Sequence, residues 1–293
     1  MSEPILKAEH LGITFGGLKA VSDFNMTINS GELVGLIGPN GAGKSTLIKL
    51  ILNMIHRDAG SIHVLGLDNI ANEEPVKEQL GVVFDSSYLY EQWQVKNVER
   101  IVAPLYSSWD GGCYRKYLYT FGLGGAQNGK KHIKDLSRGM QMKLMLAIAL
   151  SHDAKLLILD EPTAGLDVEA RNEILDLLRD YAAEDENRTI LITSHIASDL
   201  EHLCDDIYLI HGGKQLLHEE TDVILEQYGL IKADEAQYAA LDKEYLLGSR
   251  KEPYGYACLT NDRKYYEENV PGLVVERAGI DEVILMMTGG KRK

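Results

Sequence analysis

The chain has 293 residues, of which 45% are hydrophobic and 25% charged, and this is typical of a soluble globular protein with about two domains. Its 44 acidic and 30 basic residues give a net charge of −14, which argues against broad, non-specific binding to nucleic acid. The longest apolar run covers residues 144–150, far short of the ~20 residues of a membrane-spanning helix, and the first four residues lack the features of a secretory signal.

The first fifty residues are predicted to contain three strands and a helix. Residues 5–14 and 20–28 are short stretches of mixed apolar and polar residues, and a glycine pair at 16–17 indicates a turn between them. Residues 32–37 form a compact apolar run that is typical of a buried parallel strand. The helix is predicted to start near Gly43 and to carry five apolar side chains: Leu47, Ile48, Leu50, Ile51 and Met54.

The middle of the chain is predicted to be helical at first and then α/β. Residues 97–150 contain no clear strand, and a strongly apolar helix is predicted to start near Ser137. Residues 155–160 and 189–193 are two more buried-strand candidates, with an amphipathic helix between them. Strand, helix and strand in this order form a parallel α/β unit.

The composition changes after the glycine pair at 212–213. Residues 215–293 contain many tyrosines and charged residues and show no α/β repeat. We therefore predict a first domain over residues 1–219 and a small C-terminal domain over residues 220–293.

A glycine-rich motif joins the strand at 32–37 to the helix that follows it. The motif fits the phosphate-loop pattern G-x-x-x-x-G-K-[ST] and has the strand–loop–helix context that this pattern requires. Glycines let backbone N–H groups close around phosphate oxygens, and the start of the helix adds partial positive charge. Lys44 is expected to reach the β- and γ-phosphates, and Ser45 to bind Mg²⁺. The predicted nucleotide-binding residues of this loop are Gly38, Pro39, Asn40, Gly41, Ala42, Gly43, Lys44, Ser45 and Thr46.

Two adjacent carboxylates end the apolar run of residues 156–159. Asp160 is expected to hold Mg²⁺ through water, as in other P-loop NTPases. Glu161 lies next to it and is expected to polarise an attacking water. A strand that ends in Asp-Glu is common, so the assignment depends on its pairing with the phosphate loop.

Further motifs resemble those of ABC ATPases. Residues 136–140, Leu-Ser-Arg-Gly-Met, resemble the L-S-G-G-Q signature of that family, and residues 164–167 resemble its D-loop. Residues 193–195 resemble the segment with its switch histidine, and Phe15 stands where the family has an aromatic residue that stacks on adenine. The resemblance covers residues 5 to about 220.

The resemblance implies an α/β fold of the P-loop NTPase class and the ABC ATPase type. It implies an antiparallel β-subdomain near the N-terminus and a helical insertion subdomain at about 86–150. Two such domains face head to tail in the family, with ATP between the phosphate loop of one and the signature of the other. Ser137 and Gly139 match residues that contact the opposing γ-phosphate, and Arg138 lies between them. The resemblance also assigns catalytic roles to Lys44, to Glu161 as general base, and to His195 as the group that orients the γ-phosphate and water.

Three residues depart from the family pattern. Asp85 stands where the family has a glutamine after the strand that ends in Phe84, Arg138 replaces a glycine of the signature, and Met140 replaces its glutamine. Asp85 is therefore a candidate for contact with the nucleotide or with Mg²⁺. In a head-to-tail dimer Asp85 and Arg138 come from opposite subunits, and we hypothesise that they form an ion pair across the dimer when ATP closes it.

The sequence is best interpreted as the ATP-binding and ATP-hydrolysing subunit of an ABC transporter of the exporter (ABC-2-like) type. Residues 270–290 resemble the closing segment of such ATPases, and residues 88–100 resemble the stretch that docks a membrane partner in the family. The expected partners are a separate membrane permease and a second nucleotide-binding subunit, in a homodimer or heterodimer, with no nucleic acid. The expected cofactors are ATP and Mg²⁺. Three widely spaced cysteines suit a reduced compartment such as the cytoplasm. The resemblance to ABC transporter subunits implies that the protein lies on the inner face of the cell membrane, and we expect this location.

Two alternatives stay open. A soluble ABC ATPase that acts on ribosomes or DNA shares these motifs, although such proteins usually carry two cassettes or a long coiled coil. A P-loop kinase for small molecules shares the phosphate loop but leaves residues 136–140 unexplained.

Overall fold

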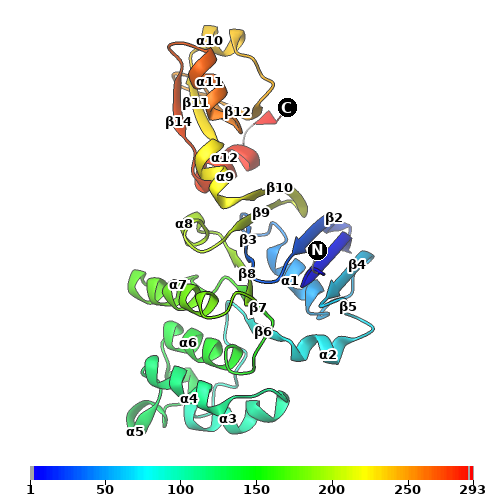
Figure 1. The fold of residues 1–293 in the computed structure, drawn as a ribbon, viewed down its shortest axis with the longest axis vertical. Helices are drawn as coiled ribbons and strands as arrows, with labels where there is room; N and C mark the ends of the chain where they lie inside the picture. Colours follow the sequence, from blue (N-terminus) through cyan, green and yellow to red (C-terminus); the bar gives the residue numbers. More distant parts are fainter. Residues whose placement is uncertain (1–2, 290, 293) are drawn as a thin grey trace.

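The computed structural model describes residues 3–289 and 291–292, and these residues form three β-sheets. Figure 1 shows the C-terminal sheet at the top, the central and N-terminal sheets in the middle, and a group of helices at the bottom. None of the helices that the structure describes combines the length and apolar character needed to cross a bilayer.

The central sheet has six strands in the order β10-β9-β3-β8-β7-β6. All neighbouring pairs are parallel except β10 and β9. Its strands are β3 (Leu33–Ile37), β6 (Leu80–Val83), β7 (Leu156–Asp160), β8 (Thr189–Ser194), β9 (Asp206–His211) and β10 (Lys214–Glu220). The predicted strands at 32–37, 155–160 and 189–193 are thus β3, β7 and β8, and they lie side by side.

Both faces of the central sheet are covered, which explains why its strands are continuous apolar runs. Alternate residues point to opposite faces. Ile37 and Leu159 belong to the hydrophobic cluster that includes side chains of α6 (Arg138–Ala149) and α7 (Val168–Ala183). Leu36 and Ile158 belong to the cluster on the other face, with side chains of α1 (Lys44–Ile51) and the N-terminal sheet.

The N-terminal sheet is antiparallel, with the order β2-β1-β4-β5. Its strands are β1 (Leu6–Phe15), β2 (Leu18–Ile28), β4 (Ala59–Val64) and β5 (Leu67–Asp68), and α2 (Glu73–Glu78) leads from it to β6. The antiparallel β-subdomain that the resemblance implies is this sheet.

The helix after the phosphate loop ends earlier than predicted. Asn53 has a left-handed φ of 50°, and the N–H of Met54 donates to the carbonyl oxygen of Lys49 at 2.8 Å. This is the hydrogen bond of a helix C-cap, so α1 ends at Ile51. The prediction that this helix carries Met54 was wrong, because Met54 lies beyond its end, with 54% of its surface exposed.

The segment between β6 and β7 is helical, as predicted. Within residues 84–155, all of which the structure describes, there is no strand beyond one isolated bridge between Gln94 and His132. Its helices are α3 (Val95–Val102), a 3₁₀ turn (Ala103–Leu105), α4 (Gly111–Thr120), α5 (Gly125–Asn128), a second 3₁₀ turn (Ile133–Asp135) and α6. They form the bottom of the molecule in Figure 1.

A buried histidine, His152, follows α6 in the chain. The ring of His152 stacks on that of Tyr106 at 3.9 Å between centroids, and neither of its nitrogens has a hydrogen-bond partner among the described residues. Burial disfavours the charged imidazolium and lowers the pKa of His152 to about 4. This histidine is therefore neutral in the folded protein at pH 7.

The C-terminal sheet has the order β14-β11-β13-β12-β15, with antiparallel neighbours. Strands and helices follow one another as β-α-β-β-α-β, which is the element order of ferredoxin-like folds. The sequence of residues 215–293 shows no α/β repeat and does not predict this order of elements. The elements are α9 (Thr221–Gln227), β11 (Gly229–Ala233), α10 (Glu235–Ala240), β12 (Leu246–Glu252), β13 (Gly255–Thr260), α11 (Arg263–Asn269), β14 (Val274–Arg277), α12 (Ile280–Gly289) and β15 (Lys291–Arg292).

Helix α12 joins this sheet to the central part of the protein. Ile280, Val283 and Met286 of α12 belong to the same hydrophobic cluster as Leu200 of the short helix α8 (Ala197–Glu201). The Oε1 atom of Glu201, at the end of α8, accepts a hydrogen bond from the N–H of Ile280 at 2.9 Å. The boundary near residue 220 stays a prediction, and the two sides of it are in contact through α8 and α12.

Candidate functional site

Four segments with predicted functional residues meet at one edge of the central sheet. Strands β3, β6, β7 and β8 are parallel, so their carboxyl ends lie together. The phosphate loop follows β3, Asp85 follows β6, Glu161 follows β7 and His195 follows β8. Residues far apart in the chain are brought together by strand order alone.

The backbone of the phosphate loop requires glycine at two positions for different reasons. A Cβ at Gly38 would lie 2.2 Å from the carbonyl oxygen of Ile210, so no side chain fits there. Gly43 has a φ of 117°, which side chains disfavour, and a Cβ there would lie 2.8 Å from the carbonyl oxygen of Ala20. The turn at 212–213 supports the loop from behind, because the N–H of Gly213 donates to the carbonyl oxygen of Ala42 at 2.9 Å.

Lys44 and Glu161 form an ion pair inside the site. The Nζ atom of Lys44 lies 3.1 Å from Oε1 of Glu161 and donates to the carbonyl oxygen of Gly38 at 2.7 Å. Both side chains are largely buried, with 6% and 14% of their surface exposed. The Oε2 atom of Glu161 is in hydrogen-bond contact with Nδ1 of His195. A lysine from the phosphate loop and a histidine from the switch segment thus hold the same carboxylate.

The backbone of Glu161 adopts an uncommon conformation that contacts with the next strand maintain. Its φ is 52°, in the left-handed region that non-glycine residues rarely adopt. Two contacts from Thr193 hold it there, because the N–H of Glu161 donates to Oγ1 at 2.9 Å and to the carbonyl oxygen at 3.2 Å.

Most of the predicted nucleotide-binding residues line one cavity of about 620 Å³. Phe15, with 49% of its surface exposed, and Asp85 are both among its lining residues. Sequence analysis did not assign several lining residues to the site. Two of these had a sequence signal: Ala164 belongs to the segment that resembles the D-loop, and the glycine pair at 212–213 marks a change in composition. The lining residues are Phe15, Leu18, Lys19, Ala20, Asn40, Gly41, Ala42, Gly43, Lys44, Ser45, Thr46, Asp85, Glu161, Ala164, His195, Gly212 and Gly213.

The site offers the oxygen donors that Mg²⁺ prefers. Ser45 and Asp85 line the cavity, and Asp160 ends the neighbouring strand with 4% of its surface exposed. Thr193 donates from Oγ1 to Oδ1 of Asp160 at 2.7 Å, which holds this carboxylate in place. A hydroxyl and two carboxylates suit a hard divalent cation, so the residues fit the ion.

The signature residues lie outside this cavity. Ser137 caps the start of α6, where its Oγ accepts from the N–H of Met140 at 3.3 Å. Arg138 Nη2 donates to the backbone oxygen of Asp85 in the same chain at 3.3 Å, and its guanidinium lies against Gly165. The described chain thus gives Arg138 an internal contact that the hypothesis of an ion pair across a dimer did not include.

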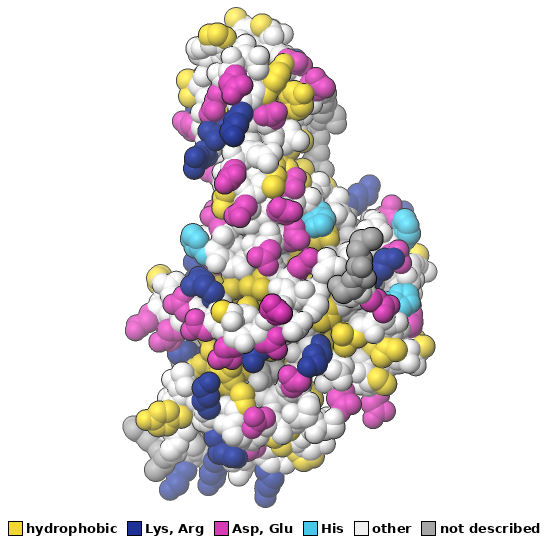
Figure 2. All heavy atoms as spheres, in the orientation of Figure 1, with side chains coloured by type: hydrophobic (Ala, Val, Ile, Leu, Met, Phe, Trp, Pro, Cys, Tyr) yellow, Lys and Arg dark blue, Asp and Glu magenta, His cyan; other side chains and the backbone are white. Residues whose placement is uncertain are grey.

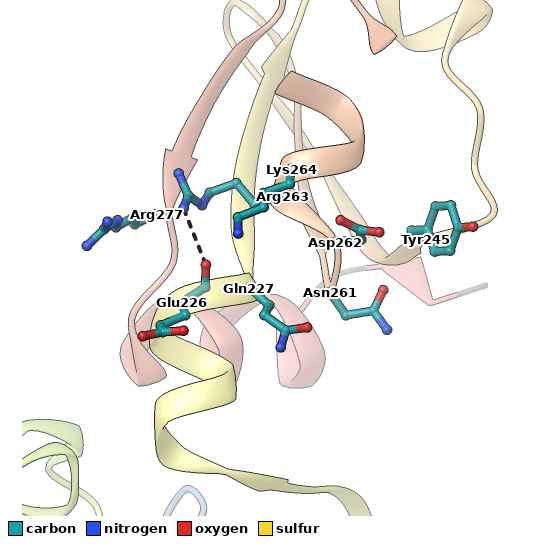
Figure 3. A pocket seen from close by; sticks show the side chains of 8 residues that line it. All are labelled: Glu226, Gln227, Tyr245, Asn261, Asp262, Arg263, Lys264 and Arg277. Carbon is teal, nitrogen blue, oxygen red and sulfur yellow. Dashed lines mark hydrogen bonds between the residues drawn. The ribbon is translucent and has the colours of Figure 1, made fainter. Parts of the chain in front are cut away.

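A second cavity of about 640 Å³ lies in the C-terminal sheet, between the end of α9 and the start of α11 (Figure 3). The Nη2 atom of Arg263 donates to the carbonyl oxygen of Glu226 at 3.3 Å, and Arg277 points away from Arg263 and Lys264. Basic, acidic and amide side chains alternate around this cavity, so it favours no ligand class. Its lining residues are Glu226, Gln227, Tyr245, Asn261, Asp262, Arg263, Lys264 and Arg277.

The fold and the first cavity define a P-loop ATPase of the ABC type. Comparison with known families supports this class, because the family model described as ABC transporter matches residues 21–164. The chain is 32% identical over 218 residues to the ABC transporter ATP-binding protein NatA of Bacillus subtilis. The alignment covers 71% of this chain and 85% of NatA. The chain therefore belongs to the ATP-binding proteins of ABC transporters, and it is an ATPase that powers transport.

Other relatives agree with this assignment. The chain is 34% identical over 218 residues to the lantibiotic transport ATP-binding protein SrtF of Streptococcus pyogenes, with 74% of this chain and 92% of that protein covered. It is also 34% identical over 229 residues to the Nod factor export ATP-binding protein I of Rhizobium johnstonii. That alignment covers 73% of this chain and 68% of the relative. A solved structure of the ATP-binding subunit of an ABC transporter superposes with a TM-score of 0.68 at 28% identity, covering 75% of this chain and 91% of that one. About a quarter of the present chain lies outside each of these matches.

Proposed function

We propose that this protein drives export through a separate membrane permease by binding and hydrolysing Mg²⁺-ATP between two nucleotide-binding subunits. The observation that carries the proposal is the single cavity that gathers the phosphate loop, Asp85, Glu161 and His195. The direction of transport is supported by the relative whose name describes Nod factor export.

The ion pair of Lys44 suggests how nucleotide binding prepares the site for hydrolysis. Lys44 is held by Glu161, and an arriving γ-phosphate would compete with that carboxylate for the ammonium group. Release of Glu161 leaves its Oε1 atom available to accept a proton from water, as a general base must. His195 remains in contact with the other oxygen of Glu161 and is placed to orient both the base and the γ-phosphate.

The remaining roles follow from positions around the cavity. Phe15 stacks on adenine at the opening, and the loop from Gly38 to Thr46 surrounds the phosphates with N–H groups. Ser45 and Asp160 would hold Mg²⁺, and Asp85, which lines the same cavity as Ser45, is the third candidate ligand. The bound cation would neutralise phosphate charge and orient the γ-phosphate for in-line attack.

A second subunit completes the site. Ser137 and Gly139 are absent from the lining of the cavity in their own chain, and the resemblance to ABC ATPases assigns them to the γ-phosphate of the opposite subunit. We propose a head-to-tail dimer, because only a second subunit can then bring a signature to this cavity.

The surface after Asp85 is the proposed contact with the permease on the inner face of the membrane. Tyr88, Tyr90 and Leu105 are large side chains that are half exposed or more. Figure 2 shows Lys and Arg side chains at the end of the molecule formed by α3, α4 and α5, although the whole chain is acidic. Exposed aromatic side chains, together with positive charge at one end of the molecule, suit a protein that contacts a membrane partner and anionic headgroups.

The proposal is tested with the protein isolated from membranes of its native host. A tagged chain, solubilised in detergent, is expected to co-purify with an integral membrane protein of many helices. The complex, reconstituted in vesicles, is expected to hydrolyse Mg²⁺-ATP, and a complex made with Glu161→Gln is expected to lose that activity. Co-sedimentation with ribosomes, without a membrane protein, would instead support the alternative of a soluble ABC ATPase.

A further inference from the structure

A fully buried carboxylate lies behind the catalytic edge of the central sheet. Asp199 belongs to α8 and has no exposed surface. Its Oδ1 atom accepts a hydrogen bond from Nε of Arg171, and its Oδ2 atom accepts from Oγ1 of Thr163 at 2.6 Å and from Oγ of Ser194 at 3.4 Å. Arg171 also donates from Nη2 to Oγ of Ser198 at 2.7 Å.

The partners of Asp199 come from three segments that each carry or flank a residue of the proposed site. Thr163 lies two residues after Glu161, and Ser194 immediately precedes His195. Arg171 is in the first turns of α7, which follows the segment 164–167 that resembles the D-loop. One carboxylate therefore holds the turn after the proposed base, the switch segment and the helix behind the D-loop.

The hydrogen bonds of Asp199 matter for stability because its carboxylate is fully buried. A carboxylate removed from water strongly destabilises the folded state unless it is paired and hydrogen-bonded. The hydrogen bonds of Asp199 offset this destabilisation only when the three segments keep their relative positions, because each segment supplies one of its partners. A displacement of the D-loop or of the switch segment would break at least one of these hydrogen bonds.

We propose that Asp199, together with Arg171, is a positioning residue for ATP hydrolysis. Asp199 keeps Glu161 and His195 in fixed positions relative to each other and to the D-loop, and it acts without contact with the nucleotide. This inference rests on the proposed hydrolysis at Glu161. It predicts a loss in the turnover number kcat, with little change in nucleotide affinity, when the hydrogen bonds to Asp199 are removed.

The first test uses Thr163, which is outside the lining of the cavity. Thr163→Val keeps the shape and removes the hydroxyl, whereas Thr163→Ser keeps the hydroxyl. We expect Thr163→Val to lower kcat roughly 10- to 100-fold, as small misplacements of catalytic groups do, with the KM for ATP changed by less than about twofold. Thr163→Ser is expected to retain most of the activity. Equal kcat values for the two variants, measured well below their melting temperatures, would overturn the inference.

The second test uses Arg171 and a matched control on the same helix. Arg171→Lys keeps a cation near Asp199 and is expected to retain more activity than Arg171→Gln. Arg179→Gln removes an ion pair with Asp176 in which both side chains are more than half exposed, and it is expected to leave kcat unchanged. A fall in melting temperature without a fall in kcat in Arg171→Gln would show that the network only stabilises the fold. If the unaltered protein hydrolyses no ATP, the proposed function fails instead.

Discussion

Replacement of Glu161 by glutamine tests the chemistry of the site most directly. The amide keeps the shape of the side chain but cannot accept a proton, and removal of a general base costs about 10² to 10⁴ in rate. This corresponds to roughly 3 to 5 kcal/mol of activation free energy, at ~1.4 kcal/mol for each factor of ten. Binding should change in the opposite direction. Lys44 lies 3.1 Å from Oε1 of Glu161, so Glu161→Gln frees the lysine from a competing anion, and ATP is expected to bind at least as tightly.

The assay combines steady-state phosphate release with equilibrium binding of ATP in the presence of Mg²⁺. Size-exclusion chromatography with ATP is expected to show the variant as a dimer, because bound ATP is no longer consumed. Asp176→Asn, which removes an exposed carboxylate on α7, serves as the control for a change in charge alone. Hydrolysis by Glu161→Gln at the rate of the unaltered protein would remove Glu161 from the mechanism, and ATP binding weakened tenfold would refute the competition for Lys44.

Three other predictions concern separate parts of the chain. Phe15→Ala is expected to weaken ATP binding by roughly 1–3 kcal/mol through lost stacking, while Phe15→Trp is not, and equal dissociation constants would place Phe15 outside the adenine site. His152 has a folded pKa of about 4, below its ordinary value, so only the unfolded chain gains its proton as the pH falls from about 6.5 to 4. The free energy of unfolding should therefore drop by about 3 kcal/mol over that window, and denaturant titrations should show this component missing in His152→Phe. Asp85→Asn and Arg138→Gln should be additive in unfolding free energy within about 0.5 kcal/mol, because the hydrogen bond from Arg138 to Asp85 goes to the backbone oxygen, which Asp85→Asn retains. They should be non-additive in ATP-dependent dimerisation, and additivity in both measurements would reject an ion pair across the dimer.

The parts of the fold that could be predicted from sequence are those with strong local signals. The strands β3, β7 and β8 are buried on both faces, so they appear as continuous apolar runs, and the phosphate loop has a fixed pattern of glycines. The C-terminal sheet gave no such signal. Tyrosines such as Tyr238, Tyr256 and Tyr266 supply much of its core, so its strands do not appear as continuous aliphatic runs in the sequence.

The parts of the site that escaped prediction depend on contacts between distant segments. The segment at Gly212 and Gly213 supports the phosphate loop from more than 160 residues away, and no local pattern indicates this role. Asp199 is similar, because an aspartate in a short helix normally indicates a solvated surface. Its burial becomes evident only from the structure, where Arg171 of α7 and Thr163 of the turn after β7 donate hydrogen bonds to its carboxylate.

The contact between Glu201 and the N–H of Ile280 has a practical consequence for shortened versions of this chain. A fragment that stops before α12 would leave the carboxylate of Glu201 without this partner and would expose apolar side chains of α8 to water. The same short helix carries Asp199 and begins two residues after His195. Hydrolysis measured on such a fragment would therefore report on an altered switch segment, and a shortened chain is not a neutral reference for the activity of the whole.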